Sequence, residues 1–152
     1  MKHYYKNFEV QYYEINKYRE ATPISILNYL EETAISHSDS VGYGMERLYD
    51  DGVAWVLNRW HVVIDKYPMW SDKITIETWP SGFERFYANR EFLIKDSEQN
   101  IIGKAASLWI FLNINSRRPA RIPAEMGVAY GIDPQRSFDY SFGKLDMADS
   151  SF

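Results

Sequence analysis

The sequence predicts an α+β fold in which one long central helix is wrapped by a curved antiparallel β-sheet. Two observations lead to this prediction. One amphipathic helical segment spans roughly residues 22–38, and four long strand-like segments follow it with connections of hairpin length. Strands that are joined by short connections pair antiparallel. A single helix must bury its apolar stripe on that sheet, so the sheet is expected to curl around the helix.

The chain begins with a predicted strand at Phe8–Tyr13 and continues into the helix. Thr22 is a suitable N-cap, and Pro23 fits the first helical position because its missing N–H would be unpaired there anyway. The helix is expected to end near the sequence SVGYG, where Gly42 or Gly44 can adopt a positive φ. Its apolar residues recur at spacings of three and four and form one stripe, comprising Ile24, Leu27, Leu30 and Ala34 and widened by Ile26 and Tyr29.

Four strands are expected after the helix. The second alternates apolar and polar residues in KITIETW, and the polar turn SEQN joins the last two into a hairpin. Their predicted bounds are Val53–Asp65, Lys73–Trp79, Arg85–Asp96 and Ile101–Ile114. A strand, a long helix and then a run of strands is the order of the hotdog fold.

The hotdog domain is expected to span residues 1–130. Residues 131–152 show little periodicity and several turn formers, which is typical of a linker or tail and not of a core element. A chain of 152 residues, of which 45% are hydrophobic and 25% charged, is long enough for one such domain with a sizeable core.

The amino-acid composition excludes several classes of function. Aromatic residues make up 16% of the chain, and they either line a cavity for a long apolar ligand or fill an ordinary core. The net charge of −4 argues against nucleic-acid binding. Cysteine is absent, which excludes disulfides, thiolate nucleophiles and cysteine metal sites and favours a reducing compartment.

The chain is expected to be soluble, cytoplasmic and free of membrane contacts. The N-terminal sequence MKHYYKNFEV has no apolar region of the kind found in secretory signals. The longest apolar stretch, SLWIFLNI, is too short to span a bilayer.

Familiar catalytic motifs are missing from the sequence. There is no G-x-S-x-G and no P-loop, and no cofactor or metal is expected. His37 and Asp39 offer two metal ligands in HSDS, but two candidates at a helix end favour solvated surface. His61, in the middle of a predicted strand, is interpreted as a hydrogen-bonded structural histidine.

Two long segments strongly resemble the N-terminal half of the acyl-ACP thioesterases. They are WVLNRWHVVIDKYPMWSDKITIETWPSG (Trp55–Gly82) and YANREFLIKDSEQNIIGKAASLWIFLNINSRRPARIP (Tyr87–Pro123). The segment YYEINKYREATPISILNYLEETA also resembles the opening strand and helix of that family, so the resemblance covers about residues 4–130. It implies two hotdog domains in tandem that hydrolyse fatty acyl thioesters of acyl carrier protein and so end fatty-acid synthesis.

The sequence departs from the family at the catalytic motif. The asparagine and histidine of a D-x-N-x-H-V-N-N pattern, expected in the second hotdog, are absent here. The sequence FGKLDMADSSF, residues 142–152, resembles the linker toward that domain. The chain is therefore interpreted as an N-terminal half, truncated or separately encoded, or as a solitary hotdog with altered function. Glu14 and Glu20 fall near the positions of the motif's first acid and histidine, which makes them weak catalytic candidates, although Arg19 beside Glu20 suggests a solvated pair.

A fatty acyl chain needs an apolar channel, and two elements can supply its walls. We expect one wall from the helix and the other from the strands, with plain core packing as the alternative. The predicted contacts are Ile24, Leu27, Trp55, Leu57, Asn58 and Trp109. Asn58 is a polar residue in an apolar strand. It is expected either to line the site or to satisfy a bulged backbone, and the sequence favours neither.

Acyl carrier proteins are acidic, so their docking surface should be locally basic. Arg117, Arg118 and Arg121 lie close together in NSRRPARIP and are the candidates, with an ordinary solvated turn as the alternative.

The favoured hypothesis is an acyl-ACP thioesterase of which this chain is the substrate-channel half. The alternatives are a non-catalytic hotdog that binds acyl groups or acyl carrier protein, and a homodimeric acyl-CoA thioesterase that uses Glu14 or Glu20. In each case self-association or pairing with a second hotdog is expected, because an uncovered strand edge promotes pairing.

Overall fold

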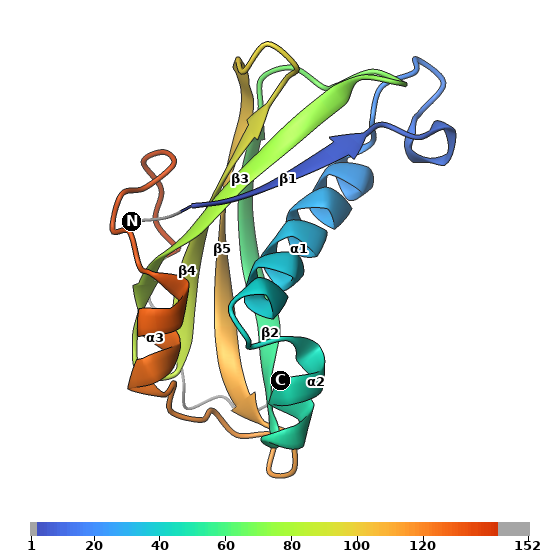
Figure 1. The fold of residues 1–152 in the computed structure, drawn as a ribbon. Coiled ribbons are helices and arrows are strands. Elements are labelled where there is room, and N and C mark those ends of the chain that lie inside the picture. The colour runs from blue at the N-terminus through green and yellow to red at the C-terminus, as the bar shows by residue number, and fades with distance from the viewer. Residues whose placement is uncertain (1–2, 143–152) are drawn as a thin grey trace.

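The computed structural model describes residues 3–142, and it confirms the predicted α+β hotdog fold. The sheet strands are β1 (Tyr4–Glu9), β2 (Val53–Ile64), β3 (Lys73–Phe83), β4 (Tyr87–Lys95) and β5 (Ile101–Asn113). They form one antiparallel sheet in the order β1-β3-β4-β5-β2, and the long helix α1 (Pro23–Ser40) crosses one of its faces (Figure 1). None of the helices within residues 3–142 is long and apolar enough to cross a membrane.

The long helix begins where the sequence predicts. The Thr22 side chain accepts a hydrogen bond from the Ser25 N–H at 3.1 Å, and Pro23 occupies the first position. After Ser40 the chain turns at Gly42, whose φ of +88° favours glycine. Gly44 has a different role, since it is the N-cap of the next helix with a φ of −68°.

The predicted apolar stripe of α1 is wrong at Ile24, which is 71% exposed. The helix buries the face that contains Ile26, Leu30 and Ala34. Each residue advances the side chain by about 100° around an α-helix, so a side chain two positions before Ile26 lies on the opposite face.

The first predicted strand is also misplaced. β1 ends at Glu9, and the residues that follow form a short 3₁₀ helix, η1 (Tyr12–Glu14). The Glu14 carboxylate accepts the Gln11 N–H at 2.8 Å, and this local bond closes a tight turn that an extended strand would not allow.

Two short helices lie outside the prediction, α2 (Met45–Asp50) and α3 (Ala124–Tyr130). They help to enclose the second of two core clusters. The first cluster joins α1 to the sheet through Ile26, Leu30, Ile76, Phe92 and Ile94. The second lies beside α2 and α3 and contains Tyr43, Leu48, Phe111, Met126 and Tyr130.

Residues 133–142 pack on the sheet, so the expectation that this segment contributes nothing to the core is wrong. Tyr140 is buried, and the Trp79 indole N–H donates to the Gln135 carbonyl at 2.8 Å. The segment covers the face of the sheet opposite α1, because Ser137 contacts Glu91 of β4 whereas the neighbouring Arg90 contacts His37 of α1. The rest of the predicted tail, 143–152, lies outside the described residues, and the domain boundary at residue 130 stays a prediction.

Candidate functional site

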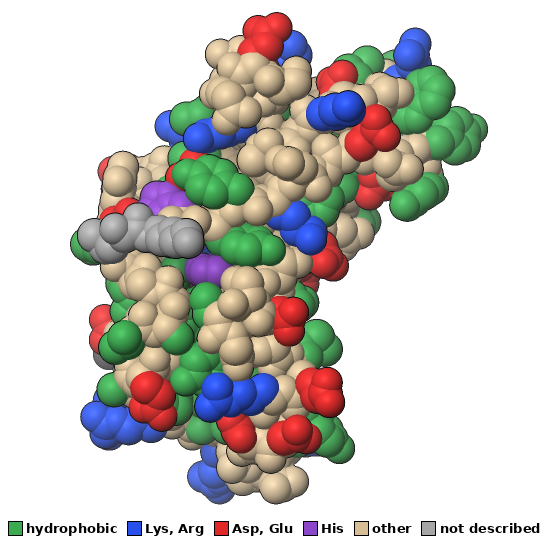
Figure 2. All heavy atoms as spheres, viewed as in Figure 1, with side chains coloured by type: hydrophobic (Ala, Val, Ile, Leu, Met, Phe, Trp, Pro, Cys, Tyr) green, Lys and Arg blue, Asp and Glu red, His purple; other side chains and the backbone are tan. Residues whose placement is uncertain are grey.

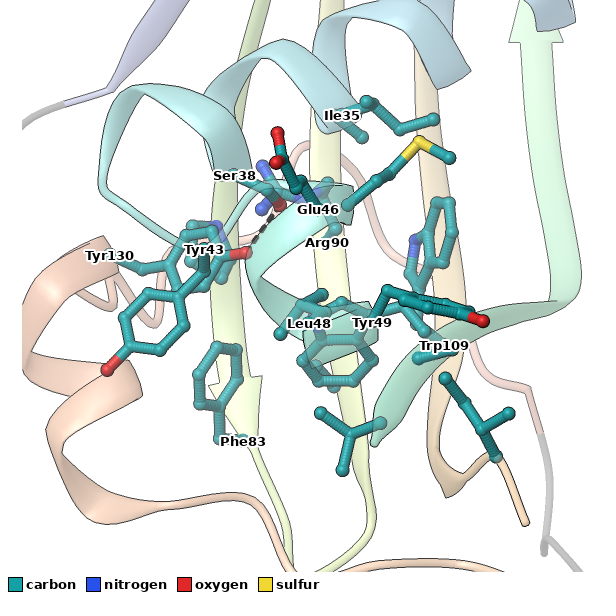
Figure 3. A pocket seen from close by; sticks show the side chains of 18 residues that line it. Ile35, Ser38, Tyr43, Glu46, Leu48, Tyr49, Phe83, Arg90, Trp109 and Tyr130 are labelled. Atoms are coloured by element: carbon teal, nitrogen blue, oxygen red, sulfur yellow. Dashed lines mark hydrogen bonds between the residues drawn. The ribbon is translucent and has the colours of Figure 1, made fainter. Parts of the chain in front are cut away.

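A cavity of about 530 Å³ lies between the C-terminal half of α1, the short helix α2 and the sheet (Figure 3). Its size is within the range of about 300–1,000 Å³ that is usual for small-molecule sites. The walls are mainly apolar, and their aromatic members are Tyr43, Tyr49, Trp55, Phe83, Trp109 and Tyr130. Such walls suit an apolar chain, because each buried methylene contributes roughly 0.8 kcal/mol.

Small side chains leave the space open. Ala34 of α1, Ala54 of β2 and Ala88 of β4 line the cavity, and none of them reaches far from its backbone. α2 closes one side: Leu48 is buried, whereas Met45 and Tyr49 are 70% and 72% exposed at the cavity rim. The cavity is therefore a gap in the core beneath a short helix that presents apolar side chains to solvent.

One wall of the cavity is polar and positively charged. The Arg90 side chain lines it, is only 6% exposed and donates through Nη1 to His37 Nδ1 at 3.0 Å and to Thr78 Oγ1 at 3.2 Å. Its guanidinium carbon lies 5.5 Å from the centre of the Tyr130 ring, a cation–π contact. Burial lowers the pKa of Arg90 to about 10, so the group is still charged near neutral pH.

His37 is buried, which corrects the expectation of a solvated residue. A guanidinium only donates, so Nδ1 of His37 accepts and the ring proton is on Nε2. Burial, and then the charge of Arg90, lower the pKa of His37 to about 3. The ring also stacks on Tyr4 with a centroid distance of 5.1 Å. His37 therefore positions the guanidinium and is not available as a base.

Two of the predicted substrate contacts, Trp55 and Trp109, line this cavity. Leu27 packs in the core cluster under α1, and Leu57 is half-buried beside Trp109 in the β2–β5 ladder. Asn58 is exposed at the β-bulge between Leu57 and Arg59, which supports its bulged-backbone interpretation.

Glu14 and Glu20 lie in the loop between β1 and α1. The Glu14 carboxylate accepts the Tyr29 hydroxyl at 2.7 Å, and the Glu20 backbone bridges to Met69. Neither residue is among those that line the cavity within residues 3–142. Figure 2 shows exposed apolar side chains at this end of the molecule, where Tyr12 and Tyr13 are 76% and 83% exposed. A catalytic role for the two glutamates stays a prediction.

The predicted docking residues Arg117, Arg118 and Arg121 are all exposed after β5, and none of them forms an ion pair within the described residues. Arg117 has a φ of +59° in a turn whose first residue, Asn113, accepts the Arg117 N–H at 2.8 Å. Ile114 in the same turn lines the cavity. The basic turn is thus next to the cavity.

Arg90 and α2 were not predicted from the sequence. Arg90 shares one face of the predicted strand with Ala88 and Phe92, and a charged residue between apolar positions on one face points to a paired or functional charge. Met45, Leu48 and Tyr49 have the i, i+3, i+4 spacing of a helix that begins after Gly44. Both patterns are visible in the sequence, but only the structure shows that these residues line a cavity.

Solved structures share this fold. An acyl-ACP thioesterase from Bacteroides thetaiotaomicron superposes with a TM-score of 0.83 at 26% identity, over 91% of this chain and 57% of that one. An oleoyl thioesterase (putative) from Lactobacillus plantarum gives a TM-score of 0.83 at 23% identity over 95% of this chain and 59% of that one, which bears on the fold alone. Fold and cavity together define a hotdog domain with room for an apolar ligand.

The chain belongs to the acyl-ACP thioesterase family, whose N-terminal domain it matches over residues 1–130. It is 31% identical over 128 residues to the palmitoyl-acyl carrier protein thioesterase of Arabidopsis thaliana, over 80% of this chain and 31% of that protein. It is 34% identical over 137 residues to oleoyl-acyl carrier protein thioesterase 2 of the same plant, over 84% of this chain and 36% of that protein. The chain thus spans about a third of the length of these curated relatives.

Proposed function

We propose that this chain is the acyl-binding half of an acyl-ACP thioesterase, an enzyme that hydrolyses fatty acyl thioesters of acyl carrier protein. The observation that carries the proposal is an apolar cavity of about 530 Å³ in a member of this family. Trp55 and Trp109 on the sheet face α1 and α2 across the cavity, so the wall contains both of the sheet aromatics that the sequence suggested for it.

In this proposal the chain holds the substrate and does not cleave it. The D-x-N-x-H-V-N-N pattern is not present in the 152 residues. His37 is held neutral as an acceptor for Arg90, and His61 is on the other side of the sheet beside Phe138 at a ring distance of 4.9 Å. A second hotdog then supplies the histidine that activates water, while this domain fixes the acyl chain and sets its preferred length.

Acyl carrier protein is the proposed partner, and the basic turn after β5 is its proposed docking surface. The turn is exposed and adjoins Ile114 in the cavity wall. A carrier that docks here would deliver its acyl group close to the cavity. Electrostatic complementarity of this kind raises the association rate more than the affinity.

Pairing with another hotdog is proposed through β2. This strand is an edge of the five-stranded sheet within residues 3–142 and has 12 residues, long enough to pair with a further strand. Sedimentation at micromolar concentration checks it: the chain should sediment as a dimer or larger species, and a stable monomer contradicts the proposal. The predicted cytoplasmic location stays a prediction, and the plant relatives are named as chloroplastic.

The test of acyl binding uses a carrier protein that bears a non-hydrolysable thioether analogue of a fatty acyl chain. Calorimetric titration should show binding that weakens several-fold in Tyr49→Ala, because this side chain covers the cavity rim. Tyr13→Ala is the control, since it removes another exposed tyrosine that is not among the residues lining the cavity. Equal losses in both variants, or none in either, contradict an acyl site in this cavity.

The second candidate is a hotdog that binds acyl groups or acyl carrier protein without hydrolysis, and the missing catalytic pattern favours it. The third, a homodimeric acyl-CoA thioesterase, needs Glu14 or Glu20. Steady-state assays of this chain with acyl-ACP and acyl-CoA separate the possibilities. We expect almost no turnover, whereas robust turnover that is lost in Glu14→Ala or Glu20→Ala establishes the homodimer.

A further inference from the structure

Arg90 carries a buried positive charge that the described part of the chain does not neutralise with a carboxylate. It is 6% exposed, and none of the ion pairs within residues 3–142 includes it. Glu46 is the acidic residue among those that line the cavity, but it is exposed on α2 and forms no ion pair with Arg90. Buried charges are normally paired, so a buried guanidinium beside an open cavity requires an explanation.

The hydrogen bonds of Arg90 use only part of its guanidinium. Nη1 donates to His37 and Thr78, and no contact within the described residues occupies Nε or Nη2. Fully enclosed side-chain nitrogens without a partner are absent from residues 3–142, so these two atoms retain accessible surface. Arg90 is one of the residues that line the cavity (Figure 3), and we take these two N–H groups as the ones available to a ligand there.

Nε and Nη2 form one edge of the guanidinium, with two N–H groups that point in nearly the same direction. This is the fork that binds both oxygens of a carboxylate. His37 and Tyr130 hold the group from the other sides, by a hydrogen bond of 3.0 Å and by a ring contact of 5.5 Å. The binding edge is therefore fixed before any ligand arrives, which reduces the entropy lost on binding.

We propose that this cavity binds free long-chain carboxylates, with the carboxylate on Nε and Nη2 of Arg90 and the hydrocarbon chain along the aromatic walls. The proposal rests on the proposed function to the extent that the same cavity receives the acyl chain. It adds a head-group preference: the released fatty acid, or another carboxylate with an apolar tail, binds more tightly than an uncharged molecule of the same shape.

The chemistry of the cavity selects a carboxylate over a phosphate. A phosphate monoester carries up to two charges and three acceptor oxygens, and one guanidinium edge satisfies only two of these oxygens. The other walls are mainly apolar and would leave the rest unpaired. A carboxylate has two oxygens and one charge, which match the single free edge.

The test compares dodecanoate with dodecan-1-ol, which have the same number of carbons and differ in the head group. In isothermal titration calorimetry at mildly alkaline pH, dodecanoate should bind the unmodified chain at least about tenfold more tightly, the low end for a charge-assisted hydrogen bond. Arg90→Met should abolish this preference and leave the affinity for dodecan-1-ol within a few-fold. Arg85→Gln, an exposed arginine outside the cavity wall, is the matched control and should keep the preference.

The outcomes separate this proposal from the proposed function. Equal affinities of the unmodified chain for the two ligands overturn carboxylate recognition and leave the acyl cavity in place. Binding of neither ligand overturns both. A preference that persists in a folded Arg90→Met variant also overturns the proposal. The comparison of ligands on the unmodified chain decides the question even if that variant does not fold.

Discussion

Two neighbouring charged residues, Arg90 and Glu91, lie in different environments on the two faces of the sheet. Arg90 and Glu91 are consecutive in β4, so their side chains point to opposite faces. Both are buried, at 6% and 0% exposure. On the α1 face, Arg90 lines a cavity and forms no ion pair within the described residues. On the other face, Glu91 is enclosed by residues 133–142 and its two oxygens are fully used.

The Glu91 carboxylate accepts four hydrogen bonds. Ser137 donates to Oε1 from its N–H at 2.9 Å and from its hydroxyl at 3.0 Å. Ser81 and Tyr140 donate their hydroxyls to Oε2. Burial, and then the contact with Glu91, raise the pKa of Tyr140 to about 12, so its hydroxyl stays protonated as a donor. This carboxylate holds the C-terminal segment on the sheet.

Glu91 therefore has a structural role, whereas Arg90 is a candidate for ligand binding. A buried ion whose hydrogen-bonding capacity is filled by its own chain has nothing left for a ligand. A buried ion with an open edge on a cavity can bind a ligand, and it does not stabilise the fold to the same extent. Variants on the two faces should therefore differ in whether stability or ligand binding changes most.

The largest effect on stability is expected from Glu91→Ala. It leaves the donors of Ser81, Ser137 and Tyr140 without their acceptor, and the free energy of unfolding should fall by about 3–5 kcal/mol. Urea unfolding measures it, with the exposed Glu84→Ala as control. A loss below about 1 kcal/mol would show that the C-terminal segment does not depend on Glu91.

The next largest effect is a pH dependence of stability that arises from His37, on the same face of the sheet as Arg90. The unfolded chain protonates His37 near its ordinary pKa of 6.5, whereas the folded chain does so only near pH 3. The unfolded state thus binds more protons in this window, and stability falls as the pH is lowered through it. Between neutrality and mildly acidic pH, His37 should account for a loss of up to about 3 kcal/mol.

His37→Gln tests this pH effect, because glutamine keeps an acceptor for Arg90 and does not titrate. Unfolding free energies across the acidic range should fall less steeply in this variant than in the unmodified chain. His61→Gln, at an exposed position, is the control and should keep the original slope. Parallel pH profiles for all three proteins contradict the neutral, buried state of His37.

Two tyrosine hydroxyls, one on each face of the sheet, should differ in what their removal costs. Tyr140→Phe removes a hydroxyl bound to the Glu91 carboxylate, which should cost about 2 kcal/mol. Tyr130→Phe removes a hydroxyl bound to the neutral Ser38 and should cost about 1 kcal/mol. Thermal and urea unfolding of the two variants give the difference. The reverse order would mean that the cavity face, not the covered face, holds the more costly hydrogen bond.

The smallest effect on stability is expected at the basic turn. Reversal of Arg117, Arg118 and Arg121 to Glu should change the unfolding free energy by less than about 1 kcal/mol, because these side chains are exposed and unpaired within the described residues. Association with acyl carrier protein should weaken and lose salt sensitivity, since salt screens exposed charges over about 8 Å at physiological ionic strength. Equal affinities at low salt would leave the three arginines as an ordinary solvated turn.

The elements of the fold were largely predictable from the sequence because their determinants are local. Thr22 and Pro23 mark the start of α1, and alternation and turn residues place the four long strands within a few residues of their true bounds. Trp55 and Trp109 were also predictable as wall residues of an apolar site, since aromatic residues in adjacent strands share the face that packs on the helix.

Tertiary structure decided what the individual charges do. Arg90 and Glu91 look equivalent in YANREFLIKD, and their different environments come from residues far away in the chain. Glu91 is satisfied by Ser137, 46 positions later, and Arg90 is held by His37, 53 positions earlier. Local periodicity specifies which side of a strand a residue faces. Which groups meet it there, and whether space is left for a ligand, depend on how distant segments pack over the sheet.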